Sequence, residues 1–291
     1  MTADVNGVPE IKRPSPPPKK GGWFAVLKPY LAPILITAIL AVGDFNYRVL
    51  SSYWYTAAAI LTAIVAETAF SLFVSGRLPH FASAYITGIS VGIILQAPVA
   101  WPFIMCSLLS ISSKYALRLK GRHIWNPSNL GVSLLLFIIP DWVAPLSQQW
   151  GNDTPVLLII AALGCTILYT LGRLHITLTF VIAFAMLASV RSWMTDRPWA
   201  GEIALLTAPA FQLYMFFMIT DPKTTPDARI ARCILAVSVA ALAHYLAFFG
   251  QMRPALYLSL ALLSPLVPLL DRLFPARRFT WLPQVAKGTP A

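Results

Sequence analysis

Residues 56–73 read TAAAILTAIVAETAFSLF, an apolar run that holds one acidic residue, Glu67. A helix of about 20 apolar residues crosses the roughly 30 Å of hydrocarbon in a bilayer. The rest of the chain has the same character, since 57% of its 291 residues are hydrophobic and 11% are charged. Soluble domains carry about a quarter charged residues. The composition therefore excludes a water-soluble enzyme and predicts an all-α polytopic membrane protein.

Apolar runs of this kind recur along the whole chain, separated by Gly, Pro and charged residues. We predict ten transmembrane helices, near residues 23–43, 53–75, 81–97, 99–117, 128–143, 155–171, 174–190, 203–220, 231–249 and 254–270. The ten-helix domain then covers residues 23–272. Residues 1–22 are Pro-rich and charged and are expected to form a disordered cytoplasmic tail. Residues 273–291 are expected to form a cytoplasmic C-terminal tail.

The basic residues test this topology, because cytoplasmic loops carry an excess of Lys and Arg. With both termini in the cytoplasm, 18 of the 22 Lys and Arg residues fall on the cytoplasmic side and 4 on the outer side. This asymmetry supports ten spans. It also accounts for the net charge of +11, so we expect the lipid bilayer as a partner and no nucleic acid.

Cysteine and histidine, the residues that usually bind iron–sulfur clusters and haem, are scattered along the sequence. Cys106, Cys165 and Cys233 are far apart and form no CxxC pair, which argues against an iron–sulfur cluster. His244 lies mid-span, but the other three histidines fall at the cytoplasmic rim, so paired haem ligation is not expected. We expect no haem, no iron–sulfur cluster and no other metal site, and we interpret His244 as a hydrogen-bonded core residue.

Glu67 is the only acidic residue well inside a predicted span. A charged residue at the centre of a membrane helix costs about 2.5–3.5 kcal/mol on insertion scales, so Glu67 should face the interior of the bundle. Three interpretations are open: a cation or proton site, a polar contact to a cofactor, or a helix-to-helix hydrogen bond.

A first polar stretch, residues 112–131, lies at the predicted cytoplasmic rim. Asn126 and Pro127 have the pattern of a helix N-cap followed by a first-turn proline. The free N–H groups at such a helix start suit phosphate or electron-rich carbonyl oxygens. Asn129 follows one turn later and is expected to point into the bundle.

A second polar stretch, residues 218–229, closes the eighth predicted span. It contains Thr220, Asp221 and Lys223 beside two prolines, a composition typical of a rigid turn. The topology places both stretches on one face, where they could close one polar pocket. The alternative is that both are ordinary basic cytoplasmic loops.

Several motifs, in order, resemble the membrane subunit family that includes the D subunit of Rnf electron-transport complexes and the B subunit of the sodium-pumping NADH:quinone reductase (RnfD/NqrB). The resemblance covers about residues 24–272. The matching segments are Glu67-Thr68-Ala69, Tyr85-Ile86-Thr87-Gly88, Lys114 with Asn126-Pro127-Ser128-Asn129-Leu130-Gly131, Phe216-Phe217-Met218-Ile219-Thr220-Asp221-Pro222, and Val267-Pro268-Leu269-Leu270-Asp271.

The resemblance implies ten helices in two related halves in a bacterial cytoplasmic membrane. It also implies bound flavins, electron transfer coupled to Na⁺ or H⁺ movement, and partner subunits that are membrane or redox proteins. We expect a non-covalent flavin, riboflavin or FMN, near the cytoplasmic rim, with Glu67 as the ion-coupling site. The residues expected to contact or line the flavin are Asn126, Pro127, Asn129, Thr220, Asp221, Lys223, Thr87 and Gly88.

The chain departs from the family in one loop. The family attaches an FMN to a threonine in an SGAT motif on the outer side, whereas residues 141–155 contain no SGAT and keep Thr154-Pro155 as a partial match. Covalent FMN is therefore not expected. In this respect the chain is similar to the shortened branch of UnbU-like proteins.

Our first hypothesis is thus an electron-transport subunit with one non-covalent flavin. The alternatives are a cofactor-free transporter with the same fold and a structural membrane subunit of a larger redox or photosynthetic complex. If the chain takes part in catalysis, we expect it to do so within a membrane redox complex rather than as a stand-alone enzyme.

Overall fold

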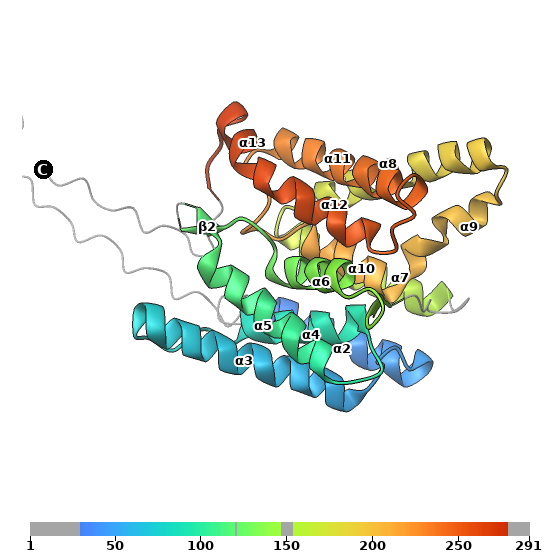
Figure 1. Cartoon of the computed structure of the whole chain (residues 1–291). Coiled ribbons are helices and arrows are strands. Elements are labelled where there is room, and N and C mark those ends of the chain that lie inside the picture. Colours follow the sequence, from blue (N-terminus) through green and yellow to red (C-terminus); the bar gives the residue numbers. More distant parts are fainter. Residues whose placement is uncertain (1–29, 120, 147–153, 279–291) are drawn as a thin grey trace, which may run out of the picture.

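The computed structural model describes residues 30–119, 121–146 and 154–278 and is mostly helical (Figure 1). Its N-terminal part contains α2 (Leu31–Tyr47), α3 (Tyr53–Ser75), α4 (Ala82–Ile94), β1 (Leu95–Gln96), α5 (Trp101–Ala116), β2 (Arg118–Leu119), β3 (Arg122–His123), α6 (Pro127–Ile138) and β4 (Ala144–Pro145). The predicted tail 1–22, the start of the first predicted span and residues 279–291 lie outside the described residues.

The C-terminal part is helical between residues 154 and 273, with several breaks. It contains α7 (Thr154–Thr170), α8 (Leu174–Thr195), α9 (Trp199–Ile203), η2 (Ala204–Thr207), α10 (Pro209–Leu213), the π-helical turn η3 (Tyr214–Met218), α11 (Arg229–Phe248), α12 (Ala255–Leu263), η4 (Ser264–Leu266) and α13 (Val267–Leu273). Each predicted span overlaps one of these helices or one broken series of them.

Four helical segments are long and apolar enough to cross a membrane by themselves: Tyr53–Ser75, Leu174–Thr195, Arg229–Phe248 and Ala255–Leu273. A fifth candidate is the pair Trp199–Thr207 and Ala210–Met218, which bends by 63° at its break. The structure is thus that of a helical membrane protein with four to five candidate full-length spans among the described residues.

The unbroken helices most shortened relative to the prediction are those at 81–97 and 128–143, which have 13 and 12 residues. At 1.5 Å per residue they measure about 20 Å and 18 Å, less than the hydrocarbon thickness. A residue that precedes proline is disfavoured in helical conformation, and α6 ends where Ile139, with φ −129°, precedes Pro140. The helix α4 ends at Ile94, because Leu95 and Gln96 are extended and pair with β4.

The two parts of the chain repeat one packing pattern. In the N-terminal part α3 packs against α4 and α5, and α5 packs against α6. In the C-terminal part α8 packs against α11, and α11 packs against α12. The contact between α6 and α12 joins the two parts, so that polar residues at the start of α6 lie beside the C-terminal helices.

The loops gather at two opposite ends of the bundle (Figure 1). At one end β2 pairs with β3, Arg118 opposite His123, near α13. The other end carries α9 and the antiparallel pair of β1 with β4, Leu95 opposite Pro145. Segments predicted to be cytoplasmic therefore meet one another, and so do segments predicted to be outside.

Gly88 marks the closest approach of α4 to α3. A Cβ atom at Gly88 would lie 2.4 Å from the Cα atom of Ile60. Since real Cβ atoms do not approach backbone this closely, only glycine lets these two helices touch. The structure thus gives Gly88 a packing role.

We predict that Gly88→Ala lowers the thermal stability of the purified chain, because α3 and α4 must separate. Overpacking of this kind costs about 1–3 kcal/mol. The matched control is Gly201→Ala, whose added Cβ would meet no atom within 4 Å. Thermal unfolding of both variants in detergent, followed by intrinsic fluorescence, measures the difference. Equal unfolding temperatures for Gly88→Ala and wild type would contradict the packing role.

Candidate functional site

Asn126 caps α6 as the sequence predicts. Its side-chain oxygen accepts hydrogen bonds from the backbone N–H of Asn129 at 3.1 Å and from the hydroxyl of Ser128 at 2.9 Å. Pro127 occupies the first turn, where an N–H has no partner within the helix. Because the side-chain oxygen of Asn126 is hydrogen-bonded within α6, the Nδ2 group is the part of the side chain that can bond to another segment.

Asp221 organises the turn that follows the π-helical turn η3. Its Oδ1 atom accepts the backbone N–H of Lys223 at 2.9 Å, and its carbonyl accepts the N–H groups of Thr224 and Thr225. Thr220 donates its hydroxyl to the carbonyl of Phe216 at 2.6 Å. These bonds make the predicted rigid turn.

The two predicted polar stretches meet in space. The Nδ2 group of Asn126 donates to Oδ2 of Asp221 at 3.3 Å, across 95 residues of sequence. Asn126 and Thr220 are buried, and Asp221 is half-buried. The start of α6 and the end of η3 therefore form one polar site at the end of the bundle that carries β2.

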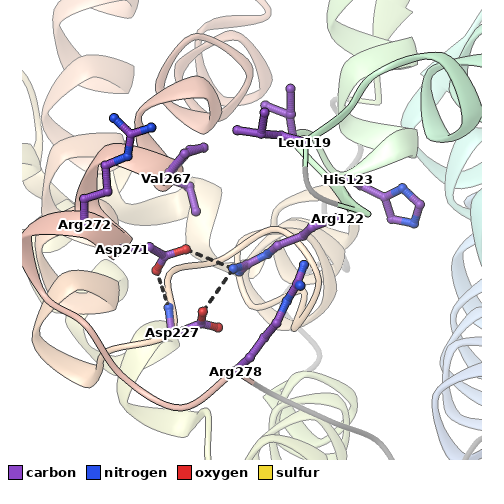
Figure 2. Close-up of a pocket in the computed structure, with 10 residues that line it drawn as sticks. Leu119, Arg122, His123, Asp227, Val267, Asp271, Arg272 and Arg278 are labelled. Carbon is purple, nitrogen blue, oxygen red and sulfur yellow. Dashed lines mark hydrogen bonds and ion pairs between the residues drawn. The ribbon is translucent and has the colours of Figure 1, made fainter.

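Arg122 holds this site together from the β3 strand (Figure 2). Its Nε atom donates to the carbonyl of Lys223 at 2.6 Å, and its Nη2 atom donates to the carbonyl of Thr225. Its Nη1 atom lies 3.4 Å from Asp227 and 2.9 Å from Asp271. One guanidinium thus joins β3, the loop after η3 and α13, an arrangement that we call the Arg122 clasp.

The surroundings of the clasp are electropositive. Burial, together with Lys223, Lys114 and Arg118, lowers the pKa of His123 to about 4. Burial also lowers the pKa of Arg173 to about 10, so Arg173 keeps its proton at pH 7 while His123 is neutral. Such an environment favours electron-rich groups.

Asn129 lies one turn into α6 and faces the C-terminal helices. Its Nδ2 group donates to the carbonyl of Tyr257 at 3.1 Å, but its buried Oδ1 atom has no hydrogen-bond partner among the described residues. The buried hydroxyl of Ser133 has none either. A buried polar atom without a hydrogen bond lowers the stability of the folded state by about 1–3 kcal/mol. We therefore expect a ligand or a water molecule to donate a hydrogen bond to these oxygens.

Thr87 and Gly88 make their contacts elsewhere. Thr87 donates its hydroxyl to the carbonyl of Ser83 at 3.0 Å, and Gly88 packs against α3. Thr87 is thus bonded to the residue that also accepts from Lys114, Gly88 lies against Ile60 of α3, and their role as flavin-lining residues stays a prediction.

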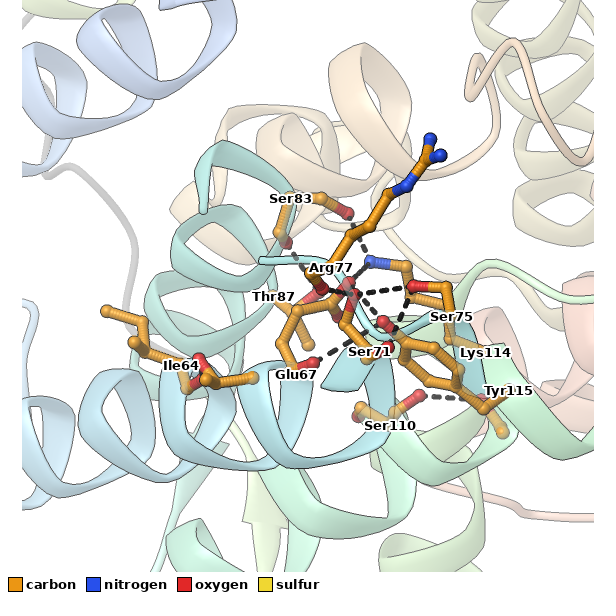
Figure 3. A network of polar contacts seen from close by, with 12 residues as sticks. Ile64, Glu67, Ser71, Ser75, Arg77, Ser83, Thr87, Ser110, Lys114 and Tyr115 are labelled. Carbon is orange, nitrogen blue, oxygen red and sulfur yellow. Dashed lines mark hydrogen bonds and ion pairs between the residues drawn. The ribbon is translucent and has the colours of Figure 1, made fainter. Parts of the chain in front are cut away.

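Glu67 is buried and forms an ion pair with Lys114 of α5 (Figure 3). The hydroxyl of Tyr115 donates to the same Oε1 atom at 2.9 Å, and Lys114 also donates to the hydroxyl of Ser83 at 3.1 Å. The Oε2 atom of Glu67 is buried without a partner among the described residues. We call Glu67, Ser83, Lys114 and Tyr115 the Glu67 cluster.

The partners in both arrangements cannot be recognised from the sequence pattern. Lys114, Arg122 and Asp271 have the pattern of loop charges or motif residues, whereas each one is an ion-pair partner in the structure. One feature of the sequence does indicate that Lys114 can pair with Glu67. Lys114 and Glu67 both lie toward the cytoplasmic ends of their predicted spans, and a long lysine side chain can reach a carboxylate at that depth.

His244 has the surroundings expected of a core histidine. Its Nδ1 atom lies 2.9 Å from the carbonyl oxygen of Ala240, and its ring lies 4.4 Å from the ring of Phe184. The middle of the loop predicted to lack covalent FMN, residues 147–153, lies outside the described residues.

Comparison with known proteins points in one direction. The sequence model of the NQR2, RnfD, RnfE family matches residues 148–280. A curated protein of Stutzerimonas stutzeri, named as the D subunit of an ion-translocating oxidoreductase complex, is 30% identical over 53% of this chain and 42% of its own length. A protein of the same name from Alcanivorax borkumensis is 26% identical over 73% of this chain and 80% of its own length.

The match thus spans less than half of the Stutzerimonas protein and most of the Alcanivorax protein. The family match covers α7 to α13, and it contains the Thr220–Asp221 turn. Over these segments the chain is similar to the NQR2, RnfD, RnfE family and to two proteins named as D subunits of ion-translocating oxidoreductase complexes.

Proposed function

We propose that this chain is a membrane-embedded electron-transport subunit that binds one non-covalent flavin between α6 and the turn after η3. The observation that carries the proposal is the hydrogen bond between Asn126 and Asp221, which unites the two motifs at one site. The two relatives are named as subunits of an ion-translocating oxidoreductase complex, which supports membrane or redox subunits as partners of this chain in a bacterial membrane.

The residues present fit a flavin. The unpaired Oδ1 atom of Asn129 is a buried acceptor that suits the ring N–H or a ribityl hydroxyl, and the unpaired hydroxyl of Ser133, one turn further along α6, adds a polar contact. Arg122, Lys223 and Arg173 hold positive charge nearby, which favours an electron-rich ring. A bound flavin supplies the one- and two-electron chemistry, while the side chains orient it and tune its potential.

Redox partners are part of this proposal. A flavin at one rim leaves most of the roughly 30 Å of hydrocarbon uncrossed, so electrons need another carrier. The chain is therefore proposed to pass electrons to or from a neighbouring subunit.

The repeated packing of α3, α5 and α6 and of α8, α11 and α12 supports a ten-helix bundle of two related halves. The meeting of Arg122, Lys223 and Asp271 at one end supports a cytoplasmic location for that end, since these loops carry the excess of basic residues. Short helices such as α4 and α6 are also a feature of transporters with broken helices.

The flavin proposal predicts a bound, extractable chromophore. The full chain, purified in mild detergent, should show flavin absorbance, and acid precipitation should release all of the flavin into the supernatant. Asn129→Ala should weaken flavin retention about tenfold, because it removes the unpaired acceptor. The control is Asn46→Ala, an exposed asparagine on α2.

A chain without flavin absorbance and without flavin in the extract would refute the proposal. Flavin that stays with the precipitated protein would show covalent attachment, contrary to the missing SGAT motif. Equal flavin content in Asn129→Ala and Asn46→Ala would remove Asn129 from the site.

We further propose that Glu67 is the ion-coupling carboxylate and that Lys114 is its internal counter-ion. The pair is neutral as a whole, whereas a cation added to it would leave a net charge in the protein interior. Entry of Na⁺ or H⁺ at Glu67 therefore requires Lys114 to withdraw. Lys114 lies in the last turn of α5, close enough to the rim for its ammonium group to move toward water.

This proposal predicts that Lys114→Met makes the stability of the chain depend on cations. Removing one partner of a buried ion pair leaves an uncompensated charge that costs about 3–5 kcal/mol, so the Glu67 carboxylate should bind Na⁺ or a proton from solution. Thermal unfolding should shift upward by several degrees when NaCl replaces choline chloride, or when the pH is lowered from 8 to 6.

The control for this experiment is the double variant Glu67→Gln/Lys114→Met, which has no buried charge to neutralise. Its unfolding temperature should respond to Na⁺ and pH no more than that of wild type. The same response in the single and double variants would show that Glu67 is not the ion site.

A further inference from the structure

A pocket of about 280 Å³ lies beside the Arg122 clasp, between the β2–β3 pair, the segment before α11 and α13 (Figure 2). It is distinct from the proposed flavin site, because neither Asn126 nor Asn129 lines it. Its volume is near the lower end for small-molecule pockets, about 300 Å³. The space therefore suits a compact group such as a lipid headgroup.

Only some of the charged side chains in this pocket have a partner of opposite charge. Asp227 and Asp271 both pair with Arg122, whereas Arg272 and Arg278 form no ion pair with any described residue. Three arginines and two aspartates line the pocket, which gives a formal net charge of +1. Figure 2 shows the side chain of Arg278 pointing toward Arg122 and that of Arg272 pointing away from it.

The pocket also offers an acceptor and an apolar wall. The Oδ1 atom of Asp227 is buried without a hydrogen-bond partner among the described residues. Leu119, Ile124, Val267 and Pro268 line the same space. A ligand that fits therefore has one negative charge, a hydrogen-bond donor close to it and an apolar part.

We propose that the pocket binds the headgroup of an anionic phospholipid whose phosphodiester faces Arg278 and whose hydroxyl group donates to Asp227. A phosphodiester carries one negative charge and balances the net charge of the pocket. A phosphate monoester carries about −1.5 to −2 at pH 7 and is a poorer match. Basic pockets between helices at the cytoplasmic side are known to hold anionic headgroups. The inference is independent of the flavin.

Native mass spectrometry of the detergent-purified full chain tests this proposal with three lipids. Phosphatidylglycerol has hydroxyl donors, phosphatidylethanolamine has an ammonium donor, and phosphatidylcholine has neither. We expect phosphatidylglycerol, which alone of the three lipids has a net negative charge, to be retained about tenfold better than phosphatidylcholine. The double variant Arg272→Gln/Arg278→Gln should lower that retention about tenfold.

The matched control is Arg77→Gln/Arg229→Gln, which removes two exposed arginines predicted on the same side but outside the pocket. It should retain lipid like wild type, and thermal unfolding should show that both double variants are folded. Glycerol 3-phosphate and inorganic phosphate serve as soluble competitors. Equal retention of all three lipids, equal loss in both double variants, or displacement of the lipid by an equal concentration of either competitor would overturn the proposal.

Discussion

The guanidinium of Arg122 is the interaction on which the candidate site depends. It donates to two backbone carbonyls in the loop after η3 and pairs with two aspartates, one of them on α13. Without this group the loop would lose its tie to β3, and two neighbouring carboxylates would lose their positive partner. Because the loop holds Asp221 against Asn126, the position of the polar site follows from the clasp.

In the Glu67 cluster, too, buried charge is held by partners within the protein. Hydrocarbon offers no hydrogen bonds, so a buried carboxylate must find its partners inside the protein. Lys114 and Tyr115 supply them to one oxygen of Glu67, and the other oxygen stays unpaired among the described residues. This unpaired oxygen is the atom on which the proposed ion-coupling role rests.

The site was predictable to the extent that its signals were local. The Asn126–Pro127 cap follows from neighbouring residues, and α6 begins at Pro127. The grouping of Asn126 with Asp221 required the topology, which the distribution of basic residues supplied. Thr87 and Gly88 were assigned by family resemblance, and their place beside a flavin stays a prediction, because a motif says nothing about which helix a side chain faces.

The sequence by itself determined that the chain is a helical membrane protein and approximately where its helices lie. It also identified the few polar groups whose burial in the membrane costs free energy and therefore requires a partner. These properties depend on composition and on residues close in sequence. The tertiary structure decided how charges pair: Glu67 with Lys114, and Arg122 with Asp227 and Asp271. Such pairs join residues 47 to 149 positions apart. They are set by which helices pack together, which no local pattern specifies.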